Sequence, residues 1–218
     1  MPKDTFFNLP KDKASRIEEA AIDEFMVYSF EAASVNRIVA KAGIAKGSFY
    51  QYFSDKKDLF KHILNQIVEQ KMACLSPVMA NPMSVDIYTL LKEIYMSGLR
   101  FAQSNPRLQK IGNLLIADRN SPIYQEFVQE NMSRSDQFFQ MLIAKGIERG
   151  DIRPDIDVPM ISWMISRMNV LLADYYQEHV KLVLDEKYLT AVDQLISFIC
   201  DGISNKRSDD TCQNESSP

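Results

Sequence analysis

The sequence predicts an all-α protein of about nine helices. Apolar residues recur at spacings of three and four through most of the 218 positions, and runs that alternate Val, Thr or Tyr with polar residues are absent. Glycine is rare, with seven residues, whereas Ala, Met, Leu, Glu and Lys are frequent, a balance typical of helices. Proline and glycine fall at the ends of the periodic segments, where they terminate helices.

The first helix is expected from about residue 11 to residue 29, after a short arm. Ile17, Ala21 and Phe25 recur there at helical spacing and form a stripe that can be buried. Charged residues occupy the opposite face of this helix. It is expected to support the two helices that follow.

Residues 34–57 predict a helix-turn-helix. Ser34 can cap its first helix, and Gly43 ends that helix. A second short helix carries Phe49 and Phe53, which are four positions apart and can both face the first helix. The outward face then combines a cation, a glycine, hydroxyl groups and an amide, as a DNA-reading surface requires: Lys46, Gly47, Ser48, Tyr50, Gln51 and Tyr52.

The charge of the chain is unevenly distributed. A formal net charge of -4 argues at first against a nucleic-acid partner. Between residues 32 and 57, however, five basic side chains accompany one acidic residue, Asp55, which gives this stretch a local charge of +4. A basic patch of this kind can lie on phosphates. The five basic residues are Arg37, Lys41, Lys46, Lys56 and Lys57.

Six further helices are expected downstream, and their ends carry recognisable residues. Asp55 and Asp157 can cap the helices that they precede, and Gly150 ends the longest one. The expected helices are 55–74, 87–105, 106–118, 122–149, 157–183 and 185–204, with a connector marked by Ser76-Pro77 and Asn81-Pro82. The predicted domains are a helix-turn-helix DNA-binding domain at residues 1–57, a helical regulatory domain for ligand binding and dimerisation at 58–205, and a disordered tail at 206–218.

Several classes of site find no support in the sequence. The cysteines Cys74, Cys200 and Cys212 lack the paired spacing of a disulfide framework or a zinc site. His62 and His179 are far apart and have no neighbouring ligand pattern, so no metal ion is expected. A nucleophile elbow and a glycine-rich phosphate loop are also absent, so neither an enzyme nor a bound cofactor is expected. Because no signal peptide or membrane span is apparent, the protein is expected in the cytoplasm.

Four matched segments carry a resemblance to a known family. They are Ala21 and Phe25 in the first helix, Ser34-Val-x-x-Ile38-Val-x-x-Ala42-Gly43-Ile44 in the second, Lys46-Gly47-Ser48-Phe49-Tyr50-x-Tyr52-Phe53 in the third, and Lys56-x-x-Leu59 at the start of the fourth. With these residues, the stretch from Ile17 to Phe60 closely resembles the DNA-binding domain of the TetR (tetracycline repressor) family of bacterial transcription regulators. The resemblance covers about a quarter of the chain.

Two positions depart from the family pattern. Ser29 stands where Gly usually ends the first helix, so the turn either avoids a left-handed residue or bears a strain on the order of 1 kcal/mol. Ala45 stands where Ser or Thr often caps the recognition helix, and the loss of that cap weakens the start of the helix by roughly 1 kcal/mol. Neither change removes a DNA contact.

The resemblance implies a set of DNA-contacting residues with distinct roles. Tyr52 and Lys56 match the phosphate-binding positions of the family, and Arg37 is expected to be free to reach a phosphate. Gln51 can pair with two positions of an adenine. Each role has a plainer alternative, such as a solvated amide for Gln51 or an ordinary surface lysine for Lys56. The predicted DNA-binding residues are Ser34, Arg37, Lys46, Gly47, Ser48, Tyr50, Gln51, Tyr52 and Lys56.

In the larger domain, the sequence indicates only a general region for a ligand site. Bulky apolar residues and one cation share a helix near residue 165, as an apolar pocket with a few polar groups requires. A stripe of this kind is also typical of a core or a dimer interface. The candidate ligand-binding residues are Tyr95, Phe101, Trp163, Met164 and Arg167, and the expected effector is a partly apolar small molecule.

These features favour a homodimeric transcription regulator, most consistent with a repressor that a small molecule releases from a palindromic DNA operator. The helices at 157–183 and 185–204 are expected to form the dimer interface as a four-helix bundle with the partner. Two alternatives stay open at this point. One is a helical metabolite-binding protein or enzyme without DNA-binding activity, and the other is a bundle that only binds proteins.

Overall fold

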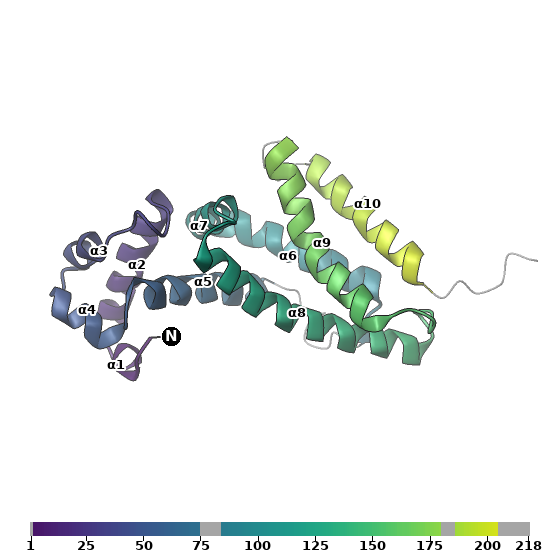
Figure 1. The fold of residues 1–218 in the computed structure, drawn as a ribbon, viewed down its shortest axis with the longest axis horizontal. Coiled ribbons are helices and arrows are strands. Elements are labelled where there is room, and N and C mark those ends of the chain that lie inside the picture. The colour runs from purple at the N-terminus through teal and green to yellow at the C-terminus, as the bar shows by residue number, and fades with distance from the viewer. Residues whose placement is uncertain (1, 75–83, 180–185, 205–218) are drawn as a thin grey trace, which may run out of the picture. The chain divides into compact units, whose positions relative to one another are not determined.

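A computed structural model describes residues 2–74, 84–179 and 186–204. Regular secondary structure is helical throughout these residues, which confirms the all-α prediction (Figure 1). The helices are α1 (Asp4–Phe7), α2 (Lys11–Val27), α3 (Val35–Ala42), α4 (Lys46–Tyr52), α5 (Lys56–Ala73), α6 (Ile87–Ser104), α7 (Pro106–Ala117), α8 (Pro122–Arg149), α9 (Val158–His179) and α10 (Glu186–Ile203).

Local signals at the helix ends act as the sequence predicts in most places. The Asp55 side chain accepts a hydrogen bond from the backbone N–H of Asp58 at 2.8 Å and so caps α5. Asp157 caps α9 in the same way, with the N–H of Met160 at 2.9 Å. Gly43 and Gly150 end α3 and α8 with φ angles of 67° and 82°, a left-handed conformation that glycine adopts without steric cost.

Other helix ends differ from the expectation. Ser34 precedes α3, but its side chain accepts no capping hydrogen bond. Helix α2 ends at Val27, and Tyr28 continues in an extended conformation with φ of -118°, so its capping residue is not left-handed. The expected arm contains the short helix α1. The predicted connector around Pro77 and Pro82, the start of the last helix at Asp185 and the disordered tail at 206–218 lie outside the described residues.

The chain divides into two compact units, each assembled from two stretches of sequence. Unit 1 comprises residues 1–76 and 96–131, and unit 2 comprises residues 77–95 and 132–218. The division falls within α6 and within α8, so each of these helices contributes to both units.

Unit 1 has one continuous apolar core that includes the helix-turn-helix. The Phe49 and Phe53 side chains of α4 and its capping position are fully buried, as predicted. The ring centroids of Phe25 and Phe60 lie 4.6 Å apart, and Ile111 of α7 joins the same cluster. Helix α7 therefore packs into the core that supports α2 and α5.

Unit 2 has its own core, formed by residues of α6, α8, α9 and α10. Among its fully or nearly fully buried members are Leu90, Ile143, Ile165 and Ile196. The loop after α8 closes over this core, because Ile152 is buried and forms an isolated β-bridge with Ser204. Across the described residues, no helix combines the length and the apolar character that crossing a bilayer requires.

Candidate nucleic-acid interface

The turn between α3 and α4 fixes the start of the candidate DNA-reading helix. Gly43 adopts the left-handed conformation, and the N–H of Ile44 donates to the carbonyl of Val39 at 3.1 Å. Ile44 then packs partly buried against the unit 1 core. Helix α4 follows from Lys46, after Ala45, which provides no side-chain cap. The turn therefore sets the direction of α4 with backbone hydrogen bonds and one apolar contact.

The outward face of α4 carries unpaired polar groups. Within the described residues, no hydrogen bond or ion pair engages the side chains of Lys46, Ser48 or Gln51. Tyr50 is 45% exposed. At Gly47, a Cβ atom would meet no other atom within 4 Å, so the backbone there is openly accessible. These groups are available to base edges and phosphates.

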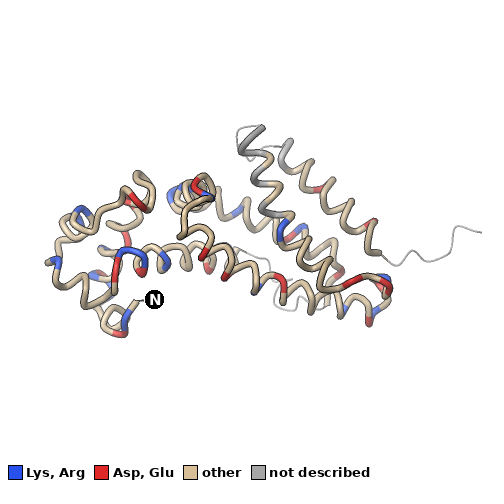
Figure 2. Tube along the Cα trace, in the orientation of Figure 1, with Lys and Arg blue, Asp and Glu red and all other residues tan. Residues whose placement is uncertain are grey.

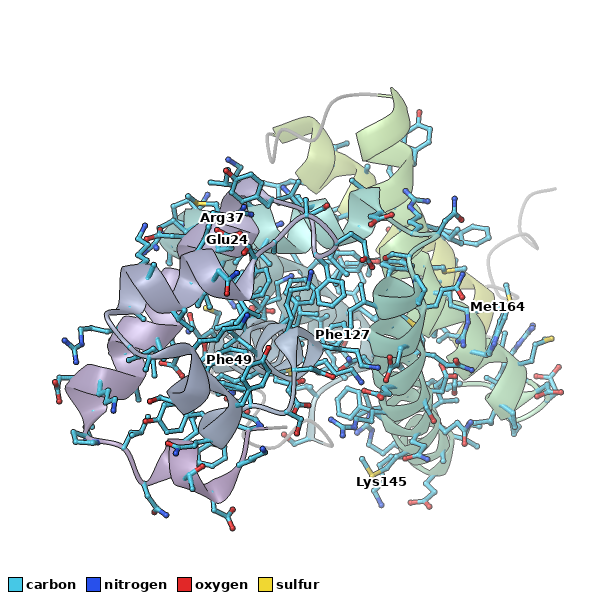
Figure 3. The ribbon with its side chains drawn as sticks, turned by 60° about the vertical axis from the view of Figure 1, so that its left-hand side comes forward. Glu24, Arg37, Phe49, Phe127, Lys145 and Met164 are labelled. Carbon is cyan, nitrogen blue, oxygen red and sulfur yellow. The ribbon has the colours of Figure 1, made fainter. Side chains whose placement is uncertain are left out.

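Arg37 is paired within the protein, so the expectation of a free guanidinium is wrong. Its Nε atom donates to both oxygens of Glu24, at 2.9 and 3.1 Å, and its guanidinium lies 4.2 Å from the centroid of the Tyr28 ring. Figure 3 shows the two side chains together. The hydrogen bond that Arg37 donates to the Glu24 carboxylate raises the pKa of the Arg37 guanidinium above its ordinary value. The Glu24 carboxylate is 8% exposed and also accepts from the N–H of Ser34 at 2.7 Å.

Lys56 holds the loop between α2 and α3. Its Nζ donates to the carbonyls of Glu31 and Ala33, at 3.1 and 2.9 Å, and lies 4.6 Å from the centroid of the Phe30 ring. An ammonium group has three donors, so one N–H of Lys56 is left for a phosphate. The position therefore fits both a structural role and a phosphate contact.

Tyr52 lies on the inner side of α4. It is 6% exposed, and the centroid of its ring lies 6.3 Å from that of Phe6. The Nζ of Lys13 lies 5.5 Å from the centroid of the same ring. This burial favours packing over the phosphate contact that the family resemblance implies.

Acidic residues from neighbouring helices neutralise much of the predicted basic patch. Lys41 pairs with Asp23 at 2.7 Å, and Lys57 pairs with Glu126 at 3.1 Å. The hydrogen bond from Lys41, together with Arg107, holds the pKa of Asp23 below its ordinary value. Figure 2 shows acidic and basic positions interspersed along the trace. Among the five basic residues of the patch, Lys46 is the one with no partner in the described part of the chain.

The predicted ligand-binding residues are divided between the two units. Phe101 is fully buried in the unit 1 core, whereas Tyr95 belongs to the core of unit 2. Trp163 and Met164 are exposed on α9. Arg167 donates to Asp136 at 2.8 Å and lies 4.3 Å from the centroid of the Trp163 ring. The residues described here also contain no group of three or more His, Cys, Asp or Glu side chains placed to hold a metal ion.

Sequence patterns missed two features of the site. The sequence pattern places Glu24 on the exposed face of the first helix. In the structure its carboxylate accepts from Ser34 and Arg37 and so joins α2 to the start of α3. Lys71 reads as a solvated lysine, yet its Nζ lies 5.2 Å from the centroid of the buried Phe101 ring, and burial lowers its pKa. Neither contact has a local signal, because the partners are 10 to 30 residues apart in the chain.

The fold and the exposed recognition helix define a helix-turn-helix DNA-binding protein, a class of transcription regulators rather than enzymes. Residues 17–63 match the family model described as "Bacterial regulatory proteins, tetR family". This segment contains the helix-turn-helix and therefore corresponds to the DNA-binding domain of TetR-family transcription regulators.

Relatives extend the similarity beyond the matched segment. The "Uncharacterized HTH-type transcriptional regulator YfiR" of Bacillus subtilis is 26% identical over 162 residues, which cover 73% of this chain and 78% of the relative. The "Fatty acid metabolism regulator protein" of the same organism is 26% identical over 171 residues, covering 71% of this chain and 78% of that protein. The crystal structure of a TetR family transcriptional regulator from Chloroflexus aurantiacus J-10-fl has a TM-score of 0.64 and 29% identity, covering 94% of this chain and 99% of that one.

Proposed function

We propose that the protein is a homodimeric, ligand-responsive repressor that acts in the cytoplasm and leaves a palindromic operator when a small molecule binds. The observation that carries this proposal is the outward face of α4, where the side chains of Lys46, Ser48 and Gln51 have no partner among the described residues. Residues 1–57 would bind DNA, and residues 58–205 would bind the effector and the second subunit.

Three of these residues are proposed to contact bases. The side-chain amide of Gln51 can accept a hydrogen bond from the N6 amino group of an adenine and donate one to its N7. Lys46 can donate to a guanine or a phosphate. Ser48 can donate to either kind of group. Tyr50, Gly47, Ser34 and Lys56 are proposed to approach the phosphate backbone. The pairing of Arg37 with Glu24 supports a structural role for its guanidinium, and the burial of Tyr52 supports a packing role for its ring.

The exposed apolar side chains of α9 and α10 support dimerisation through these helices. Trp163 is 53% exposed and Phe198 is 70% exposed, although both helices also contribute to the unit 2 core. Met160, Met164 and Leu171 add to the exposed apolar surface of α9. Two such pairs of helices can form a four-helix bundle across a twofold axis. A dimer would bind two half-sites about one helical turn apart, hence a palindromic operator.

A partly apolar acid is the effector that the chemistry of Lys71 supports. Its ammonium lies against the ring of Phe101, and no acidic side chain pairs with it in the described residues. A carboxylate could supply the missing partner, while Phe101 would contact an apolar part of the molecule. The name of the B. subtilis relative makes fatty acids the first compounds to test. The effector must bind the two conformations of the protein unequally in order to shift their populations.

The function is tested by fluorescence anisotropy with the DNA upstream of the protein's own gene and with random DNA of equal length, over a series of salt concentrations. We expect the protein to bind the upstream DNA more tightly than the random DNA, and its affinity to fall as the salt concentration rises. Lys46→Ala should reduce the slope of log K against log salt by about 1, whereas Lys145→Ala, on α8, should leave it unchanged. Equal affinity for both DNAs would support the alternative, a metabolite-binding protein without operator activity.

A further inference from the structure

The recognition helix α4 cannot satisfy its own carboxyl-terminal carbonyls. It has seven residues, and the last four carbonyls of any α-helix lack partners within the helix. The carbonyl of Phe49 accepts from the N–H of Phe53 at 2.9 Å. The carbonyls of Tyr50, Gln51 and Tyr52 therefore need donors from elsewhere.

The amino-terminal arm supplies a donor to each of these three carbonyls. The Nζ of Lys3 donates to the carbonyl of Tyr50 at 2.8 Å. The hydroxyl of Thr5 donates to the carbonyl of Gln51. The backbone N–H of Lys3 donates to the carbonyl of Tyr52 at 2.8 Å. All carbonyls at this end of α4 are thus satisfied, and two residues of the arm account for three of them.

Phe6 anchors the arm in this position. Its side chain is buried, and the centroid of its ring lies 4.8 Å from that of Phe53 and 5.3 Å from that of His62 on α5. The N–H of Phe6 also donates to the carbonyl of Lys3 at 2.8 Å, which closes the turn that leads into α1. The arm is therefore held by the core, and its two donors are aimed at α4.

Helix α4 depends on such support more than the longer helices do. Helices of this length are not stable alone in water, and Ala45 gives the start of α4 no side-chain cap. The ammonium of Lys3 also complements the partial negative charge at the carboxyl end of the helix. If the last turn loosened, Tyr50 and Gln51 would lose their fixed positions on the outward face.

We propose that Lys3 and Thr5 are positioning residues for DNA recognition, which complete the carboxyl end of α4 from the amino-terminal arm without touching DNA themselves. This role presupposes the proposed function, namely that α4 reads an operator. Because the Nζ of Lys3 donates to a backbone carbonyl, we assign Lys3 to the order of the reading helix; a phosphate contact through its remaining donors is the competing role that the salt dependence of binding tests.

DNA binding by a double variant, Lys3→Met with Thr5→Val, separates these two roles. Both substitutions keep the size of the side chain and remove its donor, and both residues are exposed, so the unit 1 core stays intact. We expect the affinity for the operator to fall roughly tenfold while the salt slope stays unchanged. Lys145→Met is the matched control for the loss of a distant lysine, and Thr5→Ser should restore the contribution of Thr5. A salt slope that falls by about 0.9 would show a direct phosphate contact and would overturn the proposal.

Hydrogen exchange in the protein without DNA tests the same role independently. The amides of residues 49–53 should exchange faster in the double variant, and those of α2 and α5 should keep the exchange rates of the original protein. Unchanged exchange at α4 would refute the positioning role. If the original protein binds no operator, the proposed function fails, whereas the exchange result still decides whether the arm orders α4.

Discussion

Gly47 illustrates how a single residue can favour binding at the expense of stability. It is the second residue of α4, and a Cβ atom there would meet nothing within 4 Å in the protein. The protein therefore has room for a larger side chain at this position. A side chain there could instead collide with a DNA backbone that approaches α4 closely, which would explain the glycine.

We predict that Gly47→Ala stabilises the fold and weakens operator binding. Alanine restricts the unfolded chain and favours helix, so the free energy of unfolding should rise by about 0.5 kcal/mol. Urea denaturation and anisotropy on the same samples measure both effects. The matched variant is Gly43→Ala, where the left-handed φ of 67° should cost about 1 kcal/mol. Unchanged operator affinity for Gly47→Ala would remove Gly47 from the proposed interface.

Lys71 is a second residue whose environment opposes stability. Its ammonium is partly withdrawn from water, and burial lowers its pKa. Protonation therefore favours the unfolded state. The resulting penalty is fully present below the folded-state pKa and disappears as the pH rises toward the ordinary value of 10.5.

We predict that Lys71→Met raises the free energy of unfolding at pH 7 by about 1 kcal/mol, because methionine keeps the apolar stem and removes the charge. The gain over the original protein should shrink as the pH is raised from 7 to 10, because Lys71 in the folded protein loses its proton below the ordinary value of 10.5. Chemical denaturation at both pH values measures this difference. The same variant should lose any response to fatty acids, and a retained response would exclude Lys71 as the effector's partner.

At the scale of the elements, the order of α3 depends on α2. Glu24, in the last turn of α2, accepts hydrogen bonds from the N–H of Ser34 and from Arg37. Because α3 supports α4 through the turn at Gly43, the position of the reading helix depends on a carboxylate two helices away.

We predict that Glu24→Gln lowers stability, because the neutral amide loses the ion pair with Arg37 and leaves fewer acceptors at a largely buried position that holds both Arg37 and the N–H of Ser34. Thermal and urea unfolding measure the loss, and operator affinity should fall with it. Glu19→Gln is the control. Glu19 pairs with Arg107 at an exposed site, where such a change costs less than about 0.5 kcal/mol. A similar effect of both variants would argue against a special role for Glu24.

The elements themselves were largely predictable, because their signals are local. Gly43, Gly150, Asp55 and Asp157 each act within a few residues of their own position. The partners of Arg37 and Lys3 lie 13 and 47 residues away, and periodicity carries no information on such contacts. Arg37 therefore looked free in the sequence, and the arm looked like an irregular leader.

At the scale of the whole molecule, the exposed apolar faces of α9 and α10 need an explanation. Phe198 is 70% exposed, next to residues of α10 that are buried in the unit 2 core. Large exposed apolar side chains that gather on neighbouring elements are typical of an interaction surface. A second copy of the chain is the occupant that the similarity to TetR-family regulators suggests.

We predict that Phe198→Glu weakens the dimer at least tenfold and leaves each subunit folded, because a carboxylate cannot be buried in an apolar interface without a partner. Light scattering at decreasing protein concentration measures the dissociation. Met141→Glu is the control, at an exposed position on α8. Operator binding should fall together with dimerisation, since one recognition helix reads only half of a palindrome. A dimer of unchanged strength would place the interface elsewhere.

The two-part composition of unit 1 bears on how its DNA specificity could be exchanged. Phe25 and Phe60 share their core with Ile111 and Leu115 of α7, which come from the second stretch of the unit. A chimaera that took only residues 1–57 from a relative would place a foreign α2 against the native α7 and lose this fit. Grafting should therefore transfer residues 96–131 as well, or be confined to Lys46, Ser48 and Gln51, whose side chains have no hydrogen-bond or ion-pair partner in the described residues.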